Sequence, residues 1–144
     1  MKRFMYIPML CIAAALAIVG CCRCGSKSRT AASLTGNTWQ LAKLMGQQVE
    51  PQGESFTLTF GEDGHLSGVG SCNRLFGDFT VTSDGKINID PLGSTRMLCP
   101  DEARENLFFR TVGEAAAYEI DGQTLMLLNN GEVQAVFTLV TAAE

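Results

Sequence analysis

The sequence predicts a mainly β protein: a small antiparallel barrel or strongly curved sheet, with one α-helix over about residues 100–115 inserted before the last strands. Short segments rich in aromatic and β-branched residues recur at even spacing, with turn residues between them. Only one segment repeats its apolar residues at helical spacing. An antiparallel sheet of this kind closes or curves to protect its edges, and the helix is expected to cover one open end.

The strands expected before the helix are marked by alternation and by turns. Trp39 gives the first strand an aromatic anchor, and a turn follows at Met45-Gly46. The segment 55–60 alternates strictly and places Phe56, Leu58 and Phe60 on one face. These strands cover residues 38–41, 55–60, 65–70, 76–81 and 87–89, with shorter extended pieces at 46–49 and 94–98.

The helix is predicted to start near Pro100, because proline favours the first helical position and Asp101 and Glu102 suit the first turn. Its apolar face consists of Leu107, Phe108, Thr111, Val112 and Ala115. Turns at 121–122 and 129–131 then separate three closing strands, at 117–120, 124–128 and 133–140.

The N-terminus is typical of an exported lipoprotein. Lys2 and Arg3 precede an apolar run of about fifteen residues, which is short of the roughly twenty that span a bilayer. The sequence 18–21, Ile-Val-Gly-Cys, looks like a lipobox, at which cleavage leaves Cys21 as the first, lipid-bearing residue. Cys22 and Cys24 have less suitable upstream residues. We therefore expect a signal peptide at 1–20, a flexible tether at 21–33 and one domain at 34–144.

The expected location is the cell envelope. A lipidated Cys21 would anchor the chain to a membrane, and by resemblance to known sorting rules the absence of aspartate at position 22 favours the outer membrane, with the domain facing the periplasm. From residue 34 onward the chain has six basic and fifteen acidic side chains. An acidic domain repels phosphate, so no nucleic-acid partner is expected.

Cys72 and Cys99 are 27 residues apart, each at the edge of a predicted strand. In an oxidising compartment we favour a disulfide, and two buried free thiols stay open as the alternative. Neither cysteine belongs to a C-x-x-C motif and the chain has one histidine, so no metal site and no cofactor are expected. A catalytic pair of Cys72 with His65 is less favoured than a solvated hairpin histidine.

Three polar residues beside the cysteines are candidates for a contact surface: Asn73, Arg74 and Arg96. Asn73 is also expected to shape a turn through its side-chain amide. The two arginines could mark an anion or partner site, but ion pairs with Asp78, Asp101 or Glu102 are the favoured interpretation.

Three blocks in order and at characteristic spacing resemble the META/HslJ domain family: Asn37 to Leu41, Gly70 to Gly77, and Ser94 to Cys99 before an acidic helix start. The resemblance covers about residues 34–140. It implies a lipocalin-class antiparallel barrel with a helix, and many bacterial members are envelope lipoproteins, some linked to heat shock or antibiotic tolerance. The family more often has Thr-Met-Ala-Cys before the helix, so the bulk of Leu98 is expected to alter local packing.

We therefore expect a non-enzymatic, lipid-anchored envelope domain that acts through contacts with an envelope protein and is monomeric. The alternative is a lipocalin-like carrier of a small apolar ligand. The side chains expected to point inward are bulky and predict a filled barrel, which favours the first interpretation. These side chains are Trp39, Phe56, Leu58, Phe60, Phe79 and Phe137.

Overall fold

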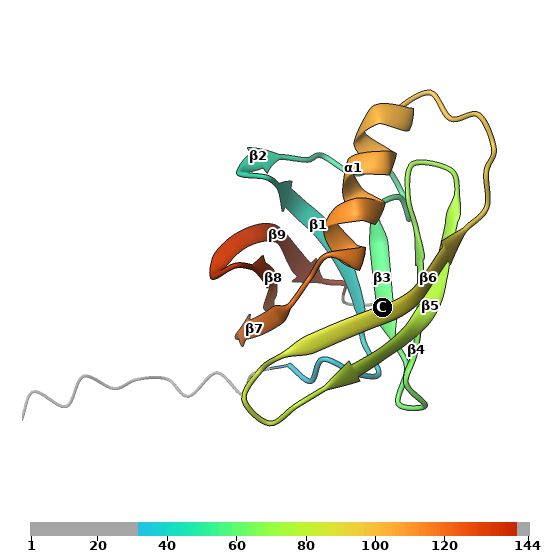
Figure 1. Ribbon diagram of the computed structural model, residues 1–144. Helices are drawn as coiled ribbons and strands as arrows, with labels where there is room; N and C mark the ends of the chain where they lie inside the picture. The colour runs from blue at the N-terminus through green and yellow to red at the C-terminus, as the bar shows by residue number, and fades with distance from the viewer. Residues whose placement is uncertain (1–31, 141–144) are drawn as a thin grey trace, which may run out of the picture.

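A nine-stranded antiparallel sheet and one helix make up the part of the chain that the structure, a computed structural model, describes, residues 32–140 (Figure 1). The strands are β1 (Thr38–Leu44), β2 (Gln47–Gln48), β3 (Thr57–Phe60), β4 (His65–Val69), β5 (Arg74–Val81), β6 (Ile87–Ser94), β7 (Ala117–Asp121), β8 (Thr124–Asn129) and β9 (Glu132–Leu139). The helix α1 (Glu102–Gly113) lies between β6 and β7 in the sequence. The predicted fold class is confirmed.

The sheet is strongly curved and is not closed into a barrel. Its order is β6-β5-β4-β3-β1-β9-β8-β7, with β2 paired to β1 alone. The two outermost strands approach each other only at one end, where the Ile87 N–H donates to the Ala116 carbonyl at 3.1 Å and the Tyr118 N–H donates to the Gly85 carbonyl at 2.9 Å. Beyond this point β6 and β7 diverge, and α1 lies across the opening (Figure 1).

The helix covers the opening because one of its faces is apolar. Phe108 and Val112 are fully buried, and the Phe108 ring meets Phe56 edge-on with 5.5 Å between ring centroids and lies 6.2 Å from the ring of Phe137. The helix is slightly shorter than predicted, because Pro100 and Asp101 form a turn before it and Glu114 closes its end through a bond to the Arg110 carbonyl.

The space inside the curve is filled by side chains, as predicted. All six residues expected to point inward are at most 7% exposed. The indole N–H of Trp39 donates to the Leu34 carbonyl at 3.0 Å, so its one polar group is satisfied within the core. A carrier would need this interior to be open, and the packing gives that alternative no support.

Most strands differ from their predicted bounds by one or more residues, and for β3 and β6 the reason is tertiary. β3 begins at Thr57, because Phe56 adopts a left-handed backbone (φ 54°) and bonds to two segments, its N–H to the Gly70 carbonyl and its carbonyl to the Leu41 N–H. β6 runs on to Ser94, beyond the predicted 87–89, because it stays paired with β5 through Leu92, Gly93 and Ser94.

Two residues of the predicted tether, Ala32 and Ser33, make hydrogen bonds within the described part of the chain. Ala32, placed in the tether by the sequence, donates its N–H to the Gly122 carbonyl at 2.9 Å, and the Ser33 carbonyl accepts from the Asn37 side chain at 2.7 Å. The predicted signal peptide, Cys21 and most of the tether lie outside the described residues. Within residues 32–140, the one helix is too short and too polar to cross a bilayer.

Candidate functional site

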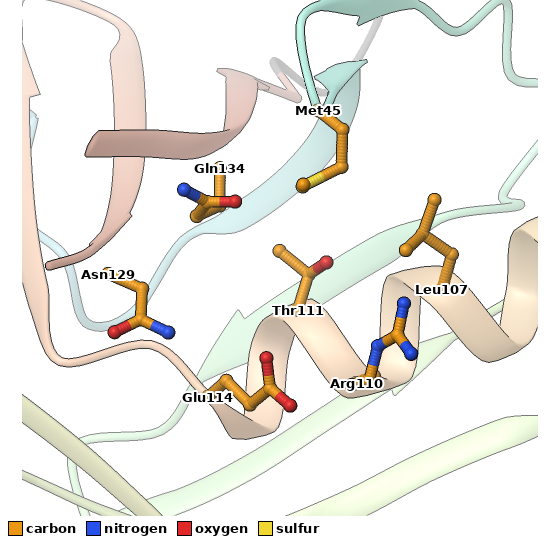
Figure 2. Close-up of a pocket in the computed structure, with 7 residues that line it drawn as sticks. All are labelled: Met45, Leu107, Arg110, Thr111, Glu114, Asn129 and Gln134. Atoms are coloured by element: carbon orange, nitrogen blue, oxygen red, sulfur yellow. The ribbon is translucent and has the colours of Figure 1, made fainter.

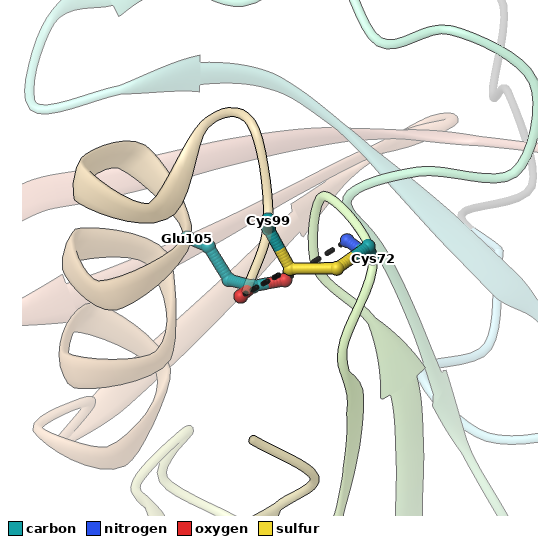
Figure 3. A group of neighbouring side chains, drawn as sticks. All are labelled: Cys72, Cys99 and Glu105. Carbon is teal, nitrogen blue, oxygen red and sulfur yellow. Dashed lines mark hydrogen bonds between the residues drawn. A yellow bond between two sulfur atoms is a disulfide. The ribbon is translucent and has the colours of Figure 1, made fainter. Parts of the chain in front are cut away.

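A disulfide joins the sheet to the start of the helix. Cys72 lies in the turn between β4 and β5, and Cys99 lies just before α1. Their Cα atoms are 5.8 Å apart and the two sulfur atoms are bonded (Figure 3). The sequence prediction that these cysteines pair agrees with this geometry.

A buried carboxylate, Glu105 of α1, lies directly beneath the disulfide (Figure 3). Its Oε1 atom accepts hydrogen bonds from the Cys72 N–H at 3.0 Å, the Asn73 N–H at 2.8 Å and the Ser71 hydroxyl at 3.2 Å. Its Oε2 atom accepts from Asn73 Nδ2 at 2.7 Å and lies 3.3 Å from Cys99 Sγ, a contact without a hydrogen, since a disulfide sulfur has none. Four donors therefore hold a side chain that is only 2% exposed.

These donors decide the charge state of Glu105. Burial raises the pKa of its carboxyl, but the hydrogen bonds from Asn73, Cys72 and Ser71 together lower it by more, so the pKa lies below its ordinary value. The group is therefore ionised at neutral pH. No cation neutralises it among residues 32–140, and its negative charge is balanced by N–H and O–H dipoles alone.

Only glycine at position 70 lets Glu105 and Phe109 of the helix lie this close to the turn. A Cβ atom there would come within 2.4 Å of Glu105 Oε1 and 2.8 Å of the Phe109 ring. The backbone of Gly70 also bonds to Asn73, its N–H donating to the Asn73 carbonyl at 2.7 Å, which tightens the turn that carries Cys72. The turn, the disulfide and the helix start are therefore packed as one unit.

Asn73 links this unit to the segment before the helix. Its Nδ2 atom donates to the Met97 carbonyl at 3.0 Å as well as to Glu105, and its Oδ1 atom accepts from the Met97 N–H at 2.7 Å and the Thr95 hydroxyl at 2.9 Å. The expected role in shaping the turn is thus extended to a second segment. The prediction that Asn73 belongs to a contact surface is wrong, because the residue is 4% exposed and its amide is fully bonded.

The segment that Asn73 holds, residues 95–98, is called the contact loop below. Its first residue, Thr95, is bonded to Arg74. The Thr95 hydroxyl accepts from the Arg74 N–H at 2.9 Å, and the Thr95 N–H donates to the Arg74 carbonyl at 3.0 Å. Beyond this anchor Met97 and Leu98 are 58% and 93% exposed. The bulk of Leu98 was expected to alter local packing, but the side chain points into solvent and packs against almost nothing.

Arg74 and Arg96 are exposed beside the contact loop, and the ion pairs predicted for them are absent. Asp78 instead contacts His65 at 2.5 Å between Oδ1 and Nδ1, and Asp101 pairs with Arg104 at 2.7 Å. Within the described part of the chain neither arginine makes an ion pair. Both charges remain available to a partner in an otherwise acidic domain.

The chemistry open to this cluster is limited. The sulfurs of Cys72 and Cys99 and a Glu105 oxygen lie within 4.8 Å of one another, a spacing that metal ligands adopt. A disulfide sulfur is not the thiolate that binds a metal or attacks a substrate, however. Both oxygens of Glu105 already accept hydrogen bonds, four in all. His65, the other predicted candidate, is a 70% exposed side chain in a hairpin, as expected.

Glu105 was not predicted as a site residue, although its position in the sequence carries a signal. Glu105 is three residues before Phe108 and seven before Val112, so helical spacing places it on the apolar face of α1. An acid inside an apolar stripe must find donors or leave the core. The donors come from residues 71–73, more than thirty positions earlier, and no local pattern connects the two segments.

The fold and the site together define a small β domain in which a disulfide and a buried carboxylate fasten the single helix to a curved sheet. A comparison with protein-family models matches residues 32–142 to the META domain. The chain belongs to the META domain family. No curated protein matches the sequence.

Three solved structures are similar to this fold. A protein from Burkholderia xenovorans, determined by NMR, is 23% identical, with a TM-score of 0.60 over 75% of this chain and 84% of its own. A second protein determined by NMR is also 23% identical, with a TM-score of 0.59 over 72% and 88% of the two chains. A DUF4847 family protein from Bacteroides vulgatus ATCC 8482 is 17% identical, with a TM-score of 0.54 over 74% and 92%. At these identities the likeness concerns the fold alone.

Proposed function

We propose that this protein is a non-catalytic, lipid-anchored domain of the cell envelope that binds a protein partner through the contact loop. The observation that carries the proposal is the exposure of Leu98, 93%, on a segment fixed by partly buried hydrogen bonds to Asn73 and by a disulfide. A lone exposed leucine on a mobile loop needs no explanation, but this one is held in a defined position.

A fixed loop suits binding because little conformational entropy remains to be lost. Ordering a flexible side chain on association costs about 0.5–1.5 kcal/mol, and an ordered backbone removes a further cost. Burial of the Leu98 side chain in a partner's pocket would contribute roughly 1.5–3 kcal/mol of favourable free energy to binding. Arg74 and Arg96 would select a partner with acidic groups around that pocket.

The remaining parts of the proposal rest on the sequence. The lipobox at Cys21 supports a membrane anchor, and the export signal supports an envelope location. The family resemblance suggests a role in stress or antibiotic tolerance. The disulfide geometry is in keeping with an oxidising compartment such as the periplasm.

Site-specific photo-crosslinking in living cells tests the contact loop. A photoreactive phenylalanine analogue at position 98 is expected to give a discrete protein adduct, and the same residue at Val81, 42% exposed on β5, serves as the matched control. Addition of Arg96→Glu should weaken the adduct, because it reverses the charge beside the loop. Equal adducts at 81 and 98, or none at 98 with normal protein levels, would contradict the proposal.

A further inference from the structure

A separate hollow lies on the other side of the helix, between α1, the β1–β2 turn and strands β8 and β9 (Figure 2). Its volume is about 250 Å³, and it shares no residue with the cluster around the disulfide. We call it the helix pocket. It is lined by Met45, Leu107, Arg110, Thr111, Glu114, Asn129 and Gln134.

The helix pocket gathers polar side chains that have few hydrogen-bond partners among residues 32–140. Thr111 is 6% exposed, and neither its hydroxyl nor the Asn129 amide makes a side-chain hydrogen bond with residues 32–140. Gln134 makes only a long bond of 3.4 Å to the Glu132 carbonyl. Among residues 32–140 no buried side-chain polar atom lacks a partner, so these groups open to the hollow, where a ligand can replace water as their hydrogen-bond partner.

The two charged residues of the pocket are also separate. Arg110 and Glu114 are four residues apart on α1, the spacing at which helix neighbours can form ion pairs, yet they make none with each other or with any described residue. Figure 2 shows the guanidinium and the carboxylate on opposite sides of Thr111. One end of the pocket is therefore cationic and the other anionic, with the Thr111 hydroxyl between them.

Met45 faces the pocket from a strained position. It has φ 49° at the first central residue of its turn, followed by Gly46 at φ 78°, a geometry in which asparagine is the usual choice. A bulky side chain in the left-handed region is rare, and such strain tends to occur at functional sites. The flexible thioether is half exposed and, with Leu107, gives the pocket an adaptable apolar wall.

We propose that the helix pocket binds a short peptide with free amino and carboxyl termini, about the size of a dipeptide. The carboxylate end pairs with Arg110 and the ammonium end with Glu114, while Thr111 and the amides of Asn129 and Gln134 bond to the central peptide group. The apolar side chain of the ligand packs against Met45 and Leu107. A single amino acid fits less well, because its two charges lie on one carbon. This inference is independent of the contact loop.

Calorimetric titration of the full-length chain in detergent with the dipeptide Ala-Leu tests the proposal. Saturable binding is expected, and N-acetylated and C-amidated forms of the same dipeptide should each bind at least about tenfold more weakly, because each loses a charged hydrogen-bonding group. Absence of binding, or equal binding of the capped forms, would overturn the proposal.

Matched variants locate the binding. Arg110→Gln and Glu114→Gln should each lower the affinity at least about tenfold, whereas Arg104→Gln on the same helix and Glu119→Gln on β7 should not change it. Thr111→Val preserves the shape of the side chain and removes no side-chain hydrogen bond among residues 32–140, so it should lower the affinity while keeping the melting temperature. Unchanged affinity in Thr111→Val, Arg110→Gln and Glu114→Gln would place the peptide elsewhere and reject the pocket.

Discussion

At the scale of single residues, Glu105 is the organising side chain of the site. It binds the turn that carries Cys72 through two backbone N–H groups, and it binds the contact loop indirectly through Asn73. A buried charge without a counter-ion is stable only when its hydrogen-bonding capacity is filled. The position of the exposed Leu98 therefore depends on a carboxylate that no solvent reaches.

Glu105→Gln is expected to destabilise the domain by about 1–3 kcal/mol, because the new amide nitrogen would face the Asn73 amide nitrogen, donor against donor. Chemical denaturation at neutral pH measures this loss. Glu102→Gln, one turn earlier and exposed, is the matched control and should change the free energy of unfolding by less than about 0.5 kcal/mol. Equal effects of the two substitutions would contradict the role assigned to Glu105.

The pH dependence of stability in the native protein and in Glu105→Gln reports the charge of Glu105. Its pKa is lower in the folded than in the unfolded chain, so its ionisation adds stability above the unfolded value, and this contribution is lost as the pH falls through the folded value. The stability difference between the native protein and Glu105→Gln should therefore shrink below about pH 4.5, the ordinary value. The exposed Asp84 and Lys86 pair is common to both proteins and cancels in this difference.

At the level of single residues, the sequence predicted the two bonded cysteines but not the roles of the residues that surround them. Cys72 and Cys99 are distinctive in spacing and context, whereas the roles of Glu105 and Asn73 depend on contacts between segments more than twenty residues apart. For Arg74 and Arg96 the sequence predicted ion pairs that are absent from the described part of the chain. Asp78 pairs instead with His65, which lies opposite it on the neighbouring strand, and Asp101 pairs with Arg104, three residues further along the chain.

At the scale of elements, prediction succeeded where one face of a strand meets one core. The alternation of residues 55–60 placed Leu58 and Phe60 on one inward face, and both are fully buried in β3. It failed at Phe56, whose left-handed backbone is fixed by Gly70, Leu41 and the ring of Phe108 on the helix. Each of those partners lies on a different element, so no window of sequence contains the cause.

The disulfide is the covalent link between two of these elements, and its removal should loosen both. Replacement of Cys72 and Cys99 by serine reopens a loop of 27 residues, which costs about 3–4 kcal/mol in the chain-entropy model. The contact loop should lose more order than the sheet. Hydrogen exchange of the Met97 amide, bonded to Asn73, is expected to accelerate well beyond that of amides in the β1–β9 pairing.

Reduction of the native protein provides the control for this substitution. Dithiol treatment should reproduce the loss of stability and the faster exchange at Met97 without changing any residue. If the reduced protein unfolds at the same denaturant concentration as the oxidised one, the disulfide does not fasten the helix start, and the double substitution would then be acting through local packing at positions 72 and 99.

At the scale of the whole molecule, the curved sheet explains why one helix suffices. The divergence of β6 and β7 leaves one side of the core open, and the apolar face of α1 closes it with Phe108 and Val112. The two candidate binding regions lie at different parts of this helix: the contact loop before its start, and the helix pocket along the side that faces the β1–β2 turn, β8 and β9. The element that completes the core thereby also supports both surfaces.

The membrane attachment that we propose requires the sulfur of Cys21, and it is tested by Cys21→Ser. The apolar run before it is too short to span a bilayer as a helix, so without lipid the protein should move from the membrane fraction to the soluble fraction or remain unprocessed. Metabolic labelling with a fatty acid should be lost in Cys21→Ser and kept in Cys22→Ser and Cys24→Ser, because only Cys21 follows a small residue in a lipobox. Label that persists in Cys21→Ser but disappears in one of the controls would move the anchor to that cysteine, and label absent from the native protein would reject the lipoprotein assignment.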